Sequence, residues 1–193
     1  MNYLAHSLLA GTDDPAFLVG NLVADHLKGR DALAALPAEV LAGVQFHRRV
    51  DRETDSHPIF RRTCARFRPE VRHFRGVLTD LFYDHVLATE WSRWGVGSLD
   101  EHSARVADSF DAMAEFLPPS FLPIAERIRS GVFFHRYATR QGMEHSLERI
   151  AGRLDRPSPL AGWITELDRL DGELRHDFAE FFPALRALLP PTH

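Results

Sequence analysis

The sequence has little of several features that mark particular classes of protein. Its 193 residues include one cysteine, Cys64, which excludes an intramolecular disulfide and a cysteine zinc cluster. No apolar run approaches the roughly 20 residues that cross a bilayer. The short apolar N-terminal run has no basic leader and contains His6. We therefore expect a cytoplasmic protein with no membrane partner.

Several catalytic motifs are also missing. The chain has no Walker-type glycine loop, no GxGxxG, no GxSxG elbow and no HExxH. Its formal charge of −4 argues against general binding to nucleic acid. Function must therefore be sought in how ordinary polar residues are placed on the fold.

The charge is uneven along the chain. Between Arg48 and Arg75 there are nine arginines against four acidic residues, a local excess of +5. This segment is either a solvated arginine-rich face or an electrostatic dock for an acidic partner or a phosphate.

Helical periodicity dominates the sequence, and alternation typical of strands is rare. With 45% hydrophobic and 26% charged residues, the chain is typical of a globular protein, and its length suits one domain over residues 1–193. The pattern predicts an all-α helical bundle, with its fourteen phenylalanines mainly in the core. Expected helices cover residues 15–27, 37–54, 55–67, 69–94, 100–116, 121–130, 132–154 and 160–188.

Capping and breaking residues support these boundaries. Thr12 or Asp13 is expected to cap the first helix, and Gly29 to end it. Pro58 disfavours helical geometry at His57, so the next helix should restart there, capped by Asp55 or the adjoining serine.

Acidic side chains recur on apolar helical stripes. Asp80 and Asp84 are four residues apart, so they share a face with apolar residues such as Val77 and Leu81. Two neighbouring carboxylates in such surroundings resist ionisation unless a cation lies between them.

Two further helices repeat this spacing. His47 and Asp51 are four apart on a stripe of valines, and Asn21 and Asp25 are four apart in the first helix. His6 lies in the apolar N-terminal run. Imidazole and carboxylate groups converging from several helices of a bundle are suitable ligands for Mn²⁺, Mg²⁺, Fe²⁺ or Zn²⁺. Each residue alone also fits a hydrogen-bonded core residue or an ion-pair partner, and arginines rather than a metal can neutralise the acids.

The same residues lie in segments that resemble the acyl carrier protein phosphodiesterase family. The matching segments are residues 1–6 (MNYLAH), 20–25 (GNLVAD) with 28–29 (KG), 43–58 (GVQFHRRVDRETDSHP) and 77–88 (VLTDLFYDHVLA). Weaker similarity continues through residues 136–137 to 178–183, so the resemblance spans nearly the whole chain. It implies a fold like that of the HD phosphohydrolases, with a divalent metal, Mn²⁺ in preference to Mg²⁺ or Fe²⁺.

The resemblance also implies an activity and a site. The family removes 4′-phosphopantetheine from holo-acyl carrier protein. The implied metal ligands are His6, Asp25, His47, Asp51, Asp80 and Asp84. In one departure from HD proteins, the adjacent His-Asp pair is here reversed, as Asp84-His85.

Further roles are assigned as hypotheses. Asp55, His57 or His85 is expected to protonate the leaving serine oxygen, because imidazole titrates near neutrality. Residues expected to bind the substrate are Asn21, Lys28, Arg48 and Arg49. Acyl carrier proteins are acidic, which suits the arginine-rich segment. Two alternatives stay open: a metal phosphohydrolase acting on a nucleotide or another small phosphodiester, and a non-enzymatic helical adaptor that binds an acidic protein.

Overall fold

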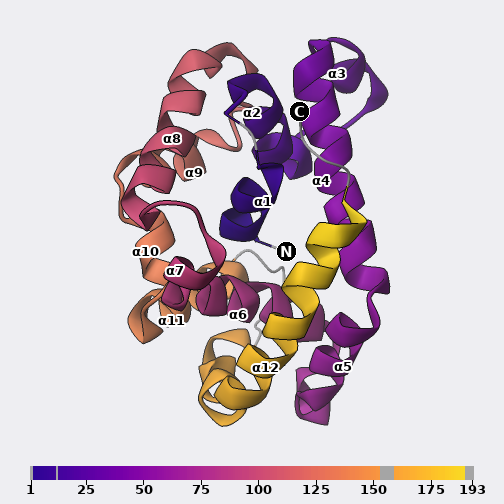
Figure 1. Ribbon diagram of the computed structural model, residues 1–193, viewed down its shortest axis with the longest axis vertical. Coiled ribbons are helices and arrows are strands. Elements are labelled where there is room, and N and C mark those ends of the chain that lie inside the picture. The colour runs from indigo at the N-terminus through magenta and orange to yellow at the C-terminus, as the bar shows by residue number, and fades with distance from the viewer. Residues whose placement is uncertain (1, 12, 153–158, 190–193) are drawn as a thin grey trace.

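The computed structural model describes residues 2–11, 13–152 and 159–189, and every regular element in these ranges is a helix. The all-α prediction is confirmed (Figure 1). The likeness to HD proteins and the assignment of one domain to residues 1–193 stay predictions. The elements are α1 (Tyr3–Ala10), α2 (Pro15–Val23), η1 (Ala24–His26), α3 (Arg30–Ala34), α4 (Ala38–Ser56), α5 (Pro58–Arg66), η2 (Pro69–Phe74), α6 (Arg75–Thr89), α7 (Trp91–Trp94), α8 (Leu99–Ala112), η3 (Ala114–Phe116), α9 (Leu122–Arg129), α10 (Phe133–Tyr137), α11 (Arg140–Ala151), η4 (Pro159–Trp163) and α12 (Ile164–Leu188).

The central helix α1 was missing from the sequence prediction. The side chain of Asn2 accepts a hydrogen bond at its N-terminus, and Gly11, at φ 58°, ends it. Gly11 serves here because a left-handed backbone is strained for residues that carry a Cβ. Seven of its eight residues are buried, and it lies in the middle of the molecule in Figure 1. An eight-residue helix is marginal in isolation, so its neighbours stabilise it.

Two long helices were predicted correctly, whereas two other predicted helices are divided in the structure. Helices α4 and α12 agree closely with the predicted ranges 37–54 and 160–188. The single helix predicted over residues 69–94 is wrong: Arg72 has φ 47°, and η2, α6 and α7 replace it. The helix predicted over 132–154 is divided at Thr139, whose side chain caps α11. Part of that range, residues 153–154, lies outside the described residues.

Caps also differ in detail from those predicted. The carboxylate of Asp14, not Asp13, accepts from the backbone N–H of Ala16 at the start of α2. Thr12, the other predicted cap, lies outside the described residues. The imidazole of His57 caps α5, where Asp55 or the adjoining serine was expected.

Two glycines set the close approach of α2 and α4. A Cβ on Gly20 would lie 2.0 Å from the carbonyl oxygen of Val40, and one on Gly43 would lie 2.1 Å from that of Phe17. Any side chain there would force the helix backbones apart. These contacts bring the end of α2, which leads to Asp25, beside the middle of α4.

Buried hydrophobic residues form one cluster that draws on most helices. All fourteen phenylalanines are in this core or packed against it, as predicted. Val77, expected on the buried face of α6, is instead 37% exposed. Among the described residues, no helix combines the length and apolar character needed to cross a membrane.

Candidate metal centre

His6, His47 and Asp51 come together between α1 and α4. Nε2 of His6 lies 3.1 Å from Oδ1 of Asp51, and Nε2 of His47 lies 3.2 Å from Oδ2 of the same carboxylate. The two imidazole rings stack with their centroids 3.9 Å apart. One ligand atom from each residue lies within 4.8 Å of the others, so the three side chains form a group able to hold a divalent metal ion.

The local structure explains how each side chain reaches this point. His47 and Asp51 are one helical turn apart on α4, which directs both to the same side. His6 arrives from α1, where the side-chain amide of Asn21 donates a 2.7 Å hydrogen bond to its carbonyl oxygen. Asn21 was predicted to bind substrate, but it is fully buried and engaged with backbone. It therefore holds α1 against α2.

Asp25 adds a second carboxylate on the open side of the group. Its Oδ1 lies 3.3 Å from Nε2 of His47, and its side chain is 78% exposed. Asp25 follows α2 directly, in the short helix η1. It is therefore the acidic group of the centre most accessible to solvent.

The pKa values of the two histidines in the centre are shifted in opposite directions. Burial lowers the pKa of His6 to about 4, so its imidazole stays neutral, the form that ligates metals. Burial alone would also lower the pKa of His47, but the carboxylates of Asp25 and Asp51 raise it to about 9. Close polar contacts with both histidines outweigh burial and hold the pKa of Asp51 well below its usual range. Without a metal, the protonated imidazole of His47 supplies the positive charge between the carboxylates of Asp25 and Asp51.

The donor set fits a divalent metal ion. Nε2 of His47 is buried and makes no well-directed hydrogen bond, although two carboxylate oxygens lie within 3.3 Å of it. A metal ion at this point would replace the proton of His47 and release it. Two imidazoles and a carboxylate suit a borderline ion better than a purely hard one.

A pocket of about 220 Å³ opens beside this group. His6, Asp25 and His47 line it, together with Asn2, Tyr3 and residues of α6, α9, α10 and α11. A second hollow, of about 610 Å³, adjoins Asp25 and includes Lys28. A larger cavity, of about 860 Å³, lies on the other face of α1 and is lined by none of His6, His47 or Asp51. Of these three hollows, the 220 Å³ pocket has the most direct access to the candidate metal group.

The structure does not bring Asp80 and Asp84 into the group of three. Asp84 is fully buried and accepts backbone hydrogen bonds from Leu4 at 3.0 Å and Ala5 at 3.2 Å. It satisfies the first free N–H groups of α1, which explains a buried carboxyl without a metal. Burial raises the pKa of Asp80 and takes that of Asp84 to about 7.

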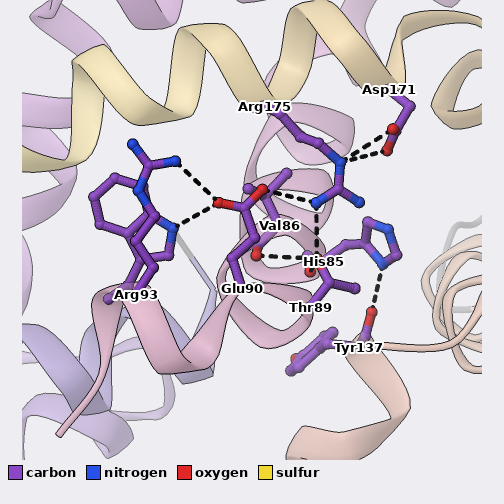
Figure 2. Close-up of polar contacts among 9 residues, drawn as sticks. His85, Val86, Thr89, Glu90, Arg93, Tyr137, Asp171 and Arg175 are labelled. Atoms are coloured by element: carbon purple, nitrogen blue, oxygen red, sulfur yellow. Dashed lines mark hydrogen bonds and ion pairs between the residues drawn. The ribbon is translucent and has the colours of Figure 1, made fainter.

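The three residues predicted to act as general acids also lie elsewhere. Figure 2 shows His85 next to the ion pair of Glu90 with Arg175, where its Nδ1 donates to the carbonyl of Tyr137 at 2.6 Å. His57 accepts from a backbone N–H at the start of α5. Asp55 is exposed near the end of α4. His57 and His85 therefore each make a structural hydrogen bond to the backbone.

The three basic residues predicted to bind the substrate lie in different surroundings. Lys28 is exposed and lines the hollow beside Asp25. Arg48 is exposed on α4, whereas Arg49 donates to the carbonyl of Leu188 at the end of α12. Lys28 is thus the one that adjoins the candidate centre through a shared hollow.

The arginine-rich segment is partly neutralised by α12. Arg62 and Arg66 both pair at 2.7 Å with Asp177, which is fully buried. Arg68 lies 3.2 Å from the buried carboxylate of Glu166. These arginines attach α5 and the following turn to α12. Fewer positive charges are therefore available to a partner than the net charge of the segment indicates.

The wall of the small pocket was not predicted from the sequence. Tyr3, Tyr137 and Arg149 line it, from α1, α10 and α11. Ser146, Arg149 and Ile150 are spaced three and four apart, which places them on one face of α11. The spacing indicates a shared face but not what that face meets.

Comparisons with known proteins identify the family of the chain. A family model described as acyl carrier protein phosphodiesterase matches residues 1–185. Proteins named acyl carrier protein phosphodiesterase include one from Serratia proteamaculans (strain 568), 33% identical over 96% of this chain and 95% of its own length. Others are from Enterobacter sp. (strain 638), 32% identical over 96% and 95%, and Escherichia coli O157:H7, 30% identical over 97% and 96%. No solved structure matches the chain. The chain belongs to the acyl carrier protein phosphodiesterase family.

Proposed function

We propose that this protein is a metal-dependent phosphodiesterase that removes 4′-phosphopantetheine from holo-acyl carrier protein and leaves the apo-protein. The observation that carries the proposal is the convergence of His6, His47 and Asp51 beside a pocket, in a chain of this family. Metal-assisted hydrolysis needs such ligands next to a space for the phosphodiester.

We further propose Mn²⁺ as the resident ion, held by the three ligand side chains. The two imidazoles favour Mn²⁺ or Fe²⁺ over Mg²⁺, which prefers oxygen ligands. When bound, a divalent ion supplies Lewis acidity, which neutralises phosphate charge and makes water more acidic.

In the reaction, a water oxygen forms a new bond to phosphorus while the bond from phosphorus to the serine oxygen breaks. One proton must leave the water, and one must reach the serine oxygen. Asp25 is the exposed carboxylate next to His47, so it is suited to take the first proton and return it to the leaving oxygen. The products are the free serine hydroxyl and 4′-phosphopantetheine.

Other residues hold this arrangement in place. Asn21 and Asp84 bind the backbone of α1, which carries His6. Lys28 lies in the hollow beyond Asp25 and adds positive charge where an acidic carrier protein would approach. These residues are proposed to position the centre and its substrate rather than to react.

The proposal is tested by metal analysis of the purified protein, together with mass spectrometry of holo-acyl carrier protein incubated with protein and Mn²⁺. Asp51→Ala should lose both the metal and the release of 4′-phosphopantetheine. The matched control is Asp100→Ala, which breaks an exposed Asp–His pair, Asp100 with His135 at 2.7 Å, and should retain both.

Other outcomes would identify the alternatives. A metal-loaded protein that hydrolyses nucleotides but leaves holo-carrier protein intact would be a different phosphohydrolase. A protein that binds the carrier, contains no metal and is insensitive to Asp51→Ala would be an adaptor. Either result would overturn the proposed function.

A further inference from the structure

The pocket beside the candidate metal group has both polar and apolar lining residues. Its polar lining includes His6, Asp25 and His47. Arg149, from α11, also lines the pocket, and apolar side chains form much of the remaining wall. The apolar and aromatic residues of this wall are Leu81, Ile124, Phe133, Tyr137 and Ile150.

A second hollow also includes Asp25. It is lined by His26, Lys28 and Ser120 together with the apolar residues Leu27, Ala32 and Pro118, and Asp25 is common to both spaces. Tyr3 stands between the two: it lines the small pocket, and its hydroxyl lies 3.3 Å from Nε2 of His26. The centre therefore borders two spaces, a small pocket that contains Arg149 and a larger hollow that contains Lys28.

We infer that the small pocket binds the pantetheine arm next to its phosphate, that Arg149 binds the phosphate, and that the carrier protein docks on the side of Lys28. This inference rests on the proposed function and adds the direction in which the substrate lies. A guanidinium group is suited to phosphate because it donates two parallel hydrogen bonds.

The chemistry of the substrate matches this direction. The carbon next to the phosphate-bearing methylene of pantetheine carries two methyl groups, which favour an apolar wall such as Leu81 and Ile150. A volume of about 220 Å³ is below the ~300–1,000 Å³ of pockets that enclose a whole drug-sized ligand. The pocket therefore accommodates the phosphate-proximal part of the arm, and the thiol end extends beyond it.

The opposite orientation, with the carrier protein in the small pocket, is disfavoured by the size of the pocket and by the exposure of Asp25. The serine belongs to a folded protein, which cannot enter a 220 Å³ space. It must reach the phosphorus from the open side, where Asp25 is 78% exposed. The hollow there, about 610 Å³, is bordered by Lys28, whose charge complements an acidic partner.

Two matched serine substitutions test the inference with the full chain in the presence of Mn²⁺. Ser146→Trp fills the small pocket, and Ser120→Trp fills the hollow beside Lys28. Calorimetric titration with free 4′-phosphopantetheine should show a Kd raised ~10-fold or more by Ser146→Trp and unchanged by Ser120→Trp. With holo-carrier protein, both variants should raise KM.

A second pair of variants tests the phosphate contact. Arg149→Met keeps an unbranched side chain but removes the charge, and should weaken 4′-phosphopantetheine binding about 10- to 100-fold while leaving the weaker binding of pantetheine unchanged. Arg105→Met is the control, because Arg105 lines the large cavity on the other face of α1. Unchanged melting temperatures separate these effects from misfolding.

The possible results distinguish failure of this inference from failure of the proposed function. If the wild type releases 4′-phosphopantetheine but Ser146→Trp and Arg149→Met bind it normally, the inference is overturned and the proposed function stands. Loss of binding only in Ser120→Trp reverses the assigned direction. A wild type that releases none overturns the proposed function, and the inference with it.

Discussion

The carboxyl group of Asp84, in the middle of α6, accepts a 3.0 Å hydrogen bond from the backbone N–H of Leu4, eighty residues earlier in the chain. It accepts a second from Ala5 at 3.2 Å. Both donors belong to the first turn of a helix, where N–H groups have no partner within the helix. A buried acid thus supports the helix that carries His6, and needs no metal to do so.

Replacing Asp84 should destabilise the protein without removing a metal ligand. Asp84→Ala leaves two buried N–H groups unsatisfied, so we expect the free energy of unfolding to fall by about 3 kcal/mol in urea titrations. Asp84→Asn retains a carbonyl acceptor and should cost less. Calorimetry should show weakened but measurable Mn²⁺ binding in both. Complete loss of metal with unchanged stability would instead make Asp84 a ligand.

His85 is expected to be dispensable for the chemistry. Its Nδ1 donates to the carbonyl of Tyr137, and burial lowers its pKa, which favours the neutral imidazole. His85→Gln can still donate to that carbonyl, and should keep kcat within a few-fold with the same pH profile. His85→Ala should raise KM, because Tyr137 lines the pocket. A pH profile that loses one limb in His85→Gln would restore His85 as the general acid.

His102 should make stability depend on pH. Burial, assisted by Arg105, lowers its pKa from 6.5 to about 4, and its Nε2 lies 2.8 Å from Oγ of Ser7. Below pH 6.5 the unfolded chain takes up a proton that the folded protein refuses, so stability falls as the pH falls. This loss is complete below about pH 4 and amounts to about 3 kcal/mol.

The matched variant is His102→Gln, which keeps a hydrogen-bonding group near Ser7 but does not titrate. Urea unfolding at several pH values should show the stability advantage of the wild type shrinking by about 3 kcal/mol between pH 7 and pH 4. A constant difference between the two proteins would contradict the role given to His102.

The sequence best predicted the arrangements that depend on spacing along one helix. His47 and Asp51 were expected on one face of α4, and the structure shows both side chains at the centre. Asp80 and Asp84 have the same spacing, yet the described structure does not bring them into the candidate metal group. Spacing decides which residues share a face, whereas the element packed against that face decides their role.

Helix content, the long helices α4 and α12, and the phenylalanine core were all determined by local periodicity and the burial of apolar side chains. Tertiary structure alone decided that residues 3–10 form a helix, because its stability comes from surrounding contacts, including Asp84. It likewise decided that α11 supplies Arg149 to the pocket. Contacts between distant segments depend on how whole helices pack, which no short stretch of sequence specifies.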